Sequence, residues 1–400
     1  MQTEASAGLA APAAGLHVRV AWLCAAVLML EGYDIAAVGY AIPSLVDAWK
    51  LPPAAFTQVL TAANVGLMLG SLSAGLAGDR WGRKPVLLAS VAAFGVFSFS
   101  TAFAHTIPAL AIARFLTGLG LGGGIPITIA LVADVAPPQT RGRLLILTSA
   151  AVPVGFTAGG LLASRLVTVF GWPAIFIAGG VLPLVVVPLL ATSLPESLAP
   201  RSAQHPSSSA AALFQNGLAS KTVLLWLINI TNYVGLYFVL LWTPAILHST
   251  GVSPARAILG TTIYAVGVLA SPLLAAFIVG RLGIERVLAV CLAFGGLCAA
   301  AIGFVAPQFW VLALLLAGVG IGNGCQAGIN SLSGLVYPPG IRSTGAGWAM
   351  GMGRIGTIGG PLFGGLLLTL GVHPQTMFLI ASIPAFAASM LMVMLGRRHV

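Results

Sequence analysis

The chain has 400 residues, of which 58% are hydrophobic and only 6% are charged, and its mean hydropathy is +1.02. Soluble globular domains carry about 25% charged residues, so this composition excludes that class and indicates a membrane protein. The formal net charge of +10 reflects basic residues at the ends of apolar segments and does not indicate nucleic-acid binding.

Apolar runs long enough to cross a hydrocarbon core of about 30 Å as a helix follow one another almost continuously along the chain. We expect an all-α membrane protein with twelve transmembrane helices, at residues 19–46, 55–78, 84–104, 107–134, 143–168, 172–194, 220–248, 255–279, 286–305, 308–336, 343–370 and 374–396. The residues before the first span lack the basic segment and the cleavage site of a signal peptide, so we expect them to be retained.

The second half of the chain repeats the first half at an offset of 201 residues. Six prolines then fall on prolines, among them Pro43 on Pro244, where chance predicts about one. Arg141 falls on Arg342 in a shared Val-x-Pro-Pro-x-x-Arg. In an apolar chain, so long a period indicates two helical bundles around a central path, as in secondary transporters. We therefore expect two pseudo-symmetric six-helix bundles, residues 1–194 and 220–400, joined by a linker at 195–219.

The basic residues favour one orientation in the membrane. Thirteen of them flank the termini and the even-numbered loops, whereas only Lys50, Arg165 and Arg256 flank the odd-numbered loops. Because basic residues favour the cytoplasmic side, we expect both termini and the linker in the cytoplasm of a bacterial-type inner membrane.

A charged, glycine-containing loop connects the second and third spans and reads Gly75-Leu-Ala-Gly-Asp79-Arg80-Trp-Gly82-Arg83-Lys84. It resembles the signature of the major facilitator superfamily at seven positions, and the general resemblance covers the whole chain. The resemblance implies the major facilitator fold and a gate that latches the cytoplasmic ends of the two bundles. We expect this gate to involve Asp79, Arg80, Gly82, Arg83, Arg141 and Arg342. The alternative is that the loop only sets the topology.

Four charged residues lie inside predicted spans, where no topology rule explains them: Glu31, Asp34, Arg114 and Arg354. An ionised side chain at this depth costs at least about 2.5 to 3.5 kcal/mol, which favours a functional role. Glu31 and Asp34 are three residues apart, so they share a helix face and repel each other when both are ionised. They form a predicted proton site, and the sequence leaves open which acid carries the proton. The alternative is that the acids pair with Arg114 and join helices.

Arg354 lies in Gly351-Met-Gly353-Arg354-Ile-Gly356, where glycines leave room for a guanidinium. A guanidinium can bind a carboxylate through two parallel hydrogen bonds, so we predict that Arg354 and Arg114 hold an anionic substrate. Aromatic and neutral polar side chains of the central spans are the other candidate ligands: Tyr33, Asn232, Tyr233, Tyr237, Gln326, Asn330 and Trp348.

The segment Glu31-Gly32-Tyr33-Asp34 resembles the first helix of the aromatic acid:proton symporters, and Tyr337-Pro338 with Gly353-Arg354-Ile-Gly356 resembles their tenth and eleventh helices. The resemblance implies a functional monomer that imports a benzoate-like or hydroxybenzoate-like anion with protons, by alternating access. Proton-driven efflux of amphipathic compounds and symport of a non-aromatic organic acid are the alternatives. Sequence motifs for a cofactor, a metal or an enzyme nucleophile are not found, so we expect no catalytic residues and no enzyme activity.

Overall fold

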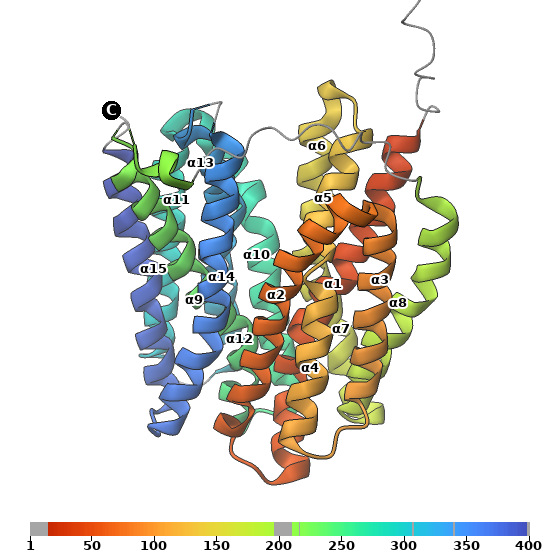
Figure 1. Ribbon diagram of the computed structural model, residues 1–400. Coiled ribbons are helices and arrows are strands. Elements are labelled where there is room, and N and C mark those ends of the chain that lie inside the picture. Colours follow the sequence, from red (N-terminus) through yellow and green to blue (C-terminus); the bar gives the residue numbers. More distant parts are fainter. Residues whose placement is uncertain (1–14, 196–209, 216, 306–307, 339–340, 398–400) are drawn as a thin grey trace, which may run out of the picture.

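The computed structural model describes residues 15–195, 210–215, 217–305, 308–338 and 341–397, and within these ranges its regular structure is entirely helical (Figure 1). The first half of the chain forms α1 (Leu16–Trp49), η1 (Pro53–Phe56), α2 (Thr57–Trp81), α3 (Arg83–Thr101), α4 (Ile107–Leu121), α5 (Gly124–Val135), α6 (Pro138–Ser149), α7 (Ala151–Phe170) and α8 (Pro173–Ser193). The second half forms η2 (Ala210–Phe214), α9 (Ala219–Ser249), α10 (Pro254–Leu282), α11 (Ile284–Ile302), α12 (Phe309–Asn323), α13 (Gln326–Val336), α14 (Arg342–Thr369) and α15 (Pro374–Gly396).

The helices of the first half lie together on one side of the molecule, and those of the second half lie on the other side (Figure 1). We call the end at which α8 stops and α9 begins the linker end, and the opposite end, where α1 and α9 stop, the far end. The start of α1 and the end of α15 both lie at the linker end (Figure 1). The predicted all-helical membrane fold is confirmed.

Three predicted spans are each built from two helices. The fourth span breaks between α4 and α5, and the tenth breaks between α12 and α13, at equivalent positions of the two halves. Glycines at both breaks allow helices to approach closely. A Cβ on Gly122 would lie 2.6 Å from the carbonyl carbon of Gly70, and one on Gly324 would lie 2.9 Å from the Cα of Val268. The fifth span divides at Ala150, between α6 and α7.

Eleven segments of the described chain are long and apolar enough to cross a membrane. The eleventh predicted span, α14, is 28 residues long but lies outside this set, because glycines and two arginines dilute its hydropathy. A helix that faces a polar path between bundles does not need an apolar surface all round. Its low hydropathy therefore agrees with the candidate site described below.

The two halves pack against each other through glycines on α1, α7 and α14. A Cβ on Gly39 would lie 2.9 Å from the carbonyl oxygen of Leu241 in α9. A Cβ on Gly160 would overlap the hydroxyl of Thr262 in α10, and one on Gly365 would overlap the side chain of Thr57 in α2. The contact between Thr57 and Gly365 lies near the far end, since α2 starts there and α14 stops there. The helices thus join the halves at this end, whereas the ribbons diverge toward the linker end (Figure 1).

Candidate functional site

A buried ion pair joins α1 to α4. The Nη2 atom of Arg114 lies 2.6 Å from Oδ2 of Asp34 and 3.1 Å from the main-chain oxygen of the same residue. Ser98 of α3 donates its hydroxyl hydrogen to Oδ1 of Asp34, and the guanidinium lies 5.4 Å from the ring centre of Phe176. Both charged side chains are at most 1% exposed. Asp34 therefore forms the helix-joining pair that the sequence left as an alternative.

Glu31 has a different environment, although it lies on the same face of α1. Its side chain is 1% exposed, and neither carboxyl oxygen has a hydrogen-bond partner. The carboxyl group lies against Gly124, where α5 begins after the break. A Cβ on this glycine would overlap Oε2 of Glu31 and would lie 2.9 Å from its Cδ. The absence of a side chain at Gly124 thus leaves the space that the Glu31 carboxyl occupies.

Arg354 of α14, in the opposite half of the molecule, is close enough to Glu31 for their charges to interact. The same guanidinium interacts electrostatically with Tyr233 and Tyr237 of α9. The two tyrosine rings lie edge to face, with their centres 6.1 Å apart. Arg354 is partly exposed and, within the described part of the chain, forms no ion pair. A cation without a carboxylate partner and two aromatic rings therefore lie together and face an unpaired acid.

Glycines of α14 create this arrangement. A Cβ on Gly353 would lie 2.9 Å from the ring of Tyr233, and one on Gly356 would lie 2.7 Å from the Cβ of the same tyrosine. Because these positions carry no side chain, α14 packs directly on α9. This close packing places Arg354 beside the aromatic pair.

A network of side-chain amides lies next to the tyrosines. Asn232 donates to Oε1 of Gln326 at 2.8 Å, and Gln326 donates to Oδ1 of Asn229 at 2.8 Å and to Oδ1 of Asn330 at 2.9 Å. The side chain of Asn330 also lies close to Tyr233. The Oδ1 atom of Asn232 has no partner. The structure thus connects three predicted ligands, Asn232, Gln326 and Asn330, to the aromatic pair.

Two predicted ligands lie apart from this group. Tyr33 is buried within the first half and donates to the carbonyl oxygen of Ile175 at 2.6 Å. Trp348 is 44% exposed and stacks on Trp226, with ring centres 5.8 Å apart. Helix spacing predicts which face of the helix a residue occupies, but not which neighbour meets that face. Both residues therefore have other partners in this conformation.

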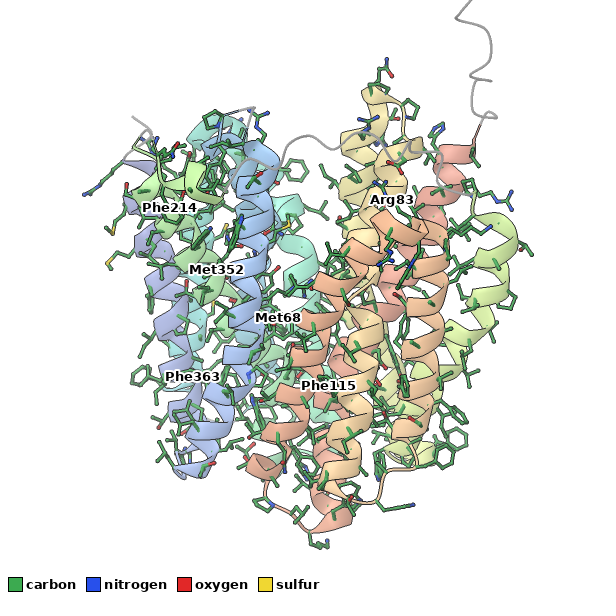
Figure 2. All side chains as sticks on the ribbon, in the orientation of Figure 1. Met68, Arg83, Phe115, Phe214, Met352 and Phe363 are labelled. Atoms are coloured by element: carbon green, nitrogen blue, oxygen red, sulfur yellow. The ribbon has the colours of Figure 1, made fainter. Side chains whose placement is uncertain are left out.

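The predicted gate residues form local contacts at the linker end. Arg83, labelled in Figure 2, donates to Asp134 and, at 2.9 Å, to the carbonyl oxygen of Ala130, which ties α3 to α5. Gly82 takes a φ of 97° at the turn from α2 to α3, a conformation that favours glycine. The guanidinium of Arg80 lies 5.9 Å from the ring centre of Trp81. The structure does not describe the side chain of Asp79, so the gate between the cytoplasmic ends of the two bundles stays a prediction.

The equivalent arginines of the two halves make equivalent contacts. Arg141 donates to the carbonyl oxygen of Ala136 at 3.3 Å, and Arg342 donates to that of Tyr337 at 3.4 Å. Each acceptor lies five residues before its arginine, in the segment that precedes a helix. These residues therefore act within their own halves here, and a contact between the halves stays a prediction.

Sequence reasoning did not identify Ser98, Phe176 or Gly124 as parts of the site. Ser98 and Phe176 carry no signal in the sequence, because serine and phenylalanine are frequent in apolar helices. Gly124 follows the Gly-x-Gly-x-Gly of residues 118–122. A glycine-rich stretch indicates close packing, but it does not show which side chain occupies the space beside each glycine. No group of three or more His, Cys, Asp or Glu side chains that could hold a metal is found in the described ranges.

Comparisons with known proteins agree with this architecture. Residues 24–228 and 225–400 each match the model of the Major Facilitator Superfamily, so the two matches begin 201 residues apart. The chain is 33% identical to a gallate transporter of Pseudomonas putida, over 95% of this chain and 92% of the relative. It is 31% identical to the 4-hydroxybenzoate transporter PcaK of Pseudomonas aeruginosa, over 97% and 94%. The crystal structure of a D-xylose-proton symporter superimposes with a TM-score of 0.76 at 19% identity, over 94% of this chain and 97% of that chain.

Proposed function

Because this chain belongs to the major facilitator superfamily, we propose that it is a proton-coupled symporter that imports a small aromatic carboxylate of the benzoate or hydroxybenzoate type. The observation that carries the proposal is the close packing of α14 at Gly353 and Gly356 on Tyr233, which brings Arg354, without an ion pair among the described residues, to the aromatic pair of α9. The named substrates of the two relatives, gallate and 4-hydroxybenzoate, are aromatic carboxylates.

Each part of an aromatic carboxylate has a complementary group in the site. The Arg354 guanidinium binds the carboxylate, because its two parallel N–H groups match the two carboxylate oxygens. Among the described residues, no acidic side chain already forms an ion pair with it. The tyrosine pair offers ring faces and edges to the aromatic ring. The amide network of Asn232, Gln326 and Asn330 offers hydrogen bonds to ring hydroxyl groups. Arg114 already binds Asp34, so its role is to hold α1 against α4, and the anion is held by Arg354.

Glu31 carries the transported proton. An ionised carboxylate that is buried without a hydrogen-bond donor costs several kcal/mol, which the protonated acid avoids. When Glu31 loses its proton, the carboxylate competes with the substrate for Arg354. Conversely, a substrate bound to Arg354 removes the positive charge that favours ionisation of Glu31. Proton and anion therefore strengthen each other's binding, as symport requires. Asp34 positions α1 through its contacts with Arg114 and Ser98.

Coupling to protons also removes an electrical barrier. A monoanion that enters a cell with a negative interior is opposed by about 2.3 kcal/mol per 100 mV. One proton makes the step electroneutral, and a second proton makes it electrogenic and more strongly accumulating.

The bundles 1–194 and 220–400 act as the two rocking units of alternating access, connected by the linker 195–219. With the linker and both termini in the cytoplasm of a bacterial inner membrane, packing at the far end corresponds to a state that is closed to the outside. The site would then release its substrate to the cytoplasm. A functional monomer is part of the same proposal.

Uptake into proteoliposomes tests the proposal. Labelled 4-hydroxybenzoate should accumulate when an inward proton gradient is imposed, and unlabelled benzoate and gallate should compete with it. Uptake that ignores the gradient would contradict symport. Equal competition by aliphatic carboxylates would indicate a non-aromatic organic acid, and transport of amphipathic cations without any aromatic acid would indicate an exporter.

A further inference from the structure

One ion pair connects the two halves at the far end of the molecule. The Nε2 atom of His248, near the end of α9, lies 3.0 Å from Oδ1 of Asp47, near the end of α1. The two residues are 201 positions apart, which is the offset of the internal duplication. They therefore occupy the same position in the two halves and meet on the pseudo-symmetry axis between them.

The pair lies away from the substrate site. Asp47 is 16 positions after Glu31 in α1, or about 24 Å along the helix at 1.5 Å per residue. The side chain of Asp47 is 56% exposed and that of His248 is 19% exposed. Solvent at the far end therefore reaches both groups, whereas Glu31 and Asp34 are buried.

The hydrogen bonds of His248 define its charge when the contact is closed. Its Nδ1 atom lies 2.9 Å from the carbonyl oxygen of Val252, and its Nε2 atom faces the Asp47 carboxylate. Neither a carbonyl nor a carboxylate oxygen can donate a hydrogen. A neutral imidazole carries one N–H and can satisfy only one of these acceptors, whereas an imidazolium satisfies both. The closed contact is therefore most favourable with the doubly protonated ring.

Other charges on the surrounding elements do not replace this contact. The charged or titratable residues that reach the far end from neighbouring helices and loops are Lys50, His105, Arg165, Arg256 and His373. Among the described residues, none of these forms an ion pair with Asp47 or His248. The pair is thus the charged contact that joins α1 to α9 there.

We propose that Asp47 and His248 form a proton-dependent latch that holds the far end closed. The imidazolium attracts Asp47 and stabilises the closed state. Loss of the proton from the solvent-accessible ring removes the attraction between opposite charges and leaves one of the two oxygen acceptors facing a lone pair, which releases the latch. Histidine side chains change charge between about pH 5 and pH 8, so the external pH would set the equilibrium between closed and open far ends. This latch does not depend on which substrate is carried.

Spin-label distances across the far end test the latch. Labels on His105→Cys and Phe304→Cys, both at exposed loop positions, would be introduced after replacing Cys24, Cys291, Cys298 and Cys325. At pH 6, Asp47→Asn or His248→Gln should each raise the ratio of open to closed molecules about two- to fivefold, as expected for a solvent-accessible ion pair. Raising the pH to 8 should shift the parent protein in the same direction and leave Asp47→Asn unchanged.

The duplication provides a sharper variant. Exchange of the two residues, Asp47→His with His248→Asp, should restore the parent ratio, because the positions are equivalent. Lys50→Gln and Arg256→Gln serve as matched controls that remove a nearby charge and should leave the ratio unchanged. The proposal is overturned if the single variants match the parent, or if the exchange opens the far end as much as the two single changes together. Counterflow activity of each variant confirms that it is folded.

Discussion

Glu31→Gln tests the proposed proton site most directly. Glutamine has the shape of a protonated glutamic acid but cannot release a proton. In the structure the Glu31 carboxyl is 1% exposed, lacks hydrogen-bond partners and occupies the space over Gly124. A neutral side chain of the same size fits this space, so we expect the variant to fold and to leave Arg354 free for substrate.

The expected size of the effect follows from the coupling scheme. A difference of one pH unit is worth about 1.36 kcal/mol per coupled proton, which supports about tenfold accumulation. If Glu31 carries the only coupled proton, Glu31→Gln reduces this ratio to about one. Substrate exchange should continue, and the apparent affinity for substrate should no longer fall as the pH rises, because no carboxylate forms to compete for Arg354.

Two assays in proteoliposomes separate these outcomes. Accumulation of labelled 4-hydroxybenzoate is measured with and without an imposed pH gradient, and counterflow is measured at equal pH across a range of pH values. Gradient-driven accumulation by Glu31→Gln at the parent level would refute Glu31 as the proton carrier. Loss of both accumulation and counterflow would refute the idea that the neutral side chain leaves the anion site intact.

Three further variants test the neighbouring parts of the site. Arg354→Gln should weaken 4-hydroxybenzoate binding about thirtyfold or more, the effect of losing about 2 kcal/mol of a charge-assisted pair; unchanged affinity in a binding titration would dismiss the anion site. Asp34→Asn should destabilise the protein by about 3 to 5 kcal/mol, because it leaves the buried charge of Arg114 unpaired. Thermal unfolding in detergent measures this loss, and Asp34→Asn with Arg114→Met should recover part of it, whereas an unaltered transition would argue against the pair. Gly124→Ala should raise the half-saturating substrate concentration about tenfold, or about 1.4 kcal/mol, by pushing the Glu31 carboxyl toward Arg354. Gly142→Ala adds the same methyl where nothing lies within 4 Å and should leave transport unchanged.

Much of the architecture could be predicted from the chain alone. The low charge and the long apolar runs predict membrane helices, and the proline register predicts the duplication, because helix length and internal symmetry are local or periodic features of a sequence. Pro43 and Pro244 indeed lie inside α1 and α9. The breaks in the fourth and tenth spans were not predicted. They depend on how closely α2 and α10 approach the glycines of the neighbouring helices.

The amino-acid sequence by itself determined which charges enter the membrane and that Glu31 and Asp34 share one face of α1. Only the tertiary structure decided that these two acids have different partners. Arg114 is 80 positions from Asp34, and Gly124 belongs to a separate helix from Glu31, so neither contact can be read from spacing along α1. Helical periodicity specifies the direction of a side chain, whereas packing between helices selects the group it meets. That selection leaves Asp34 paired with an arginine and Glu31 without a hydrogen-bond partner.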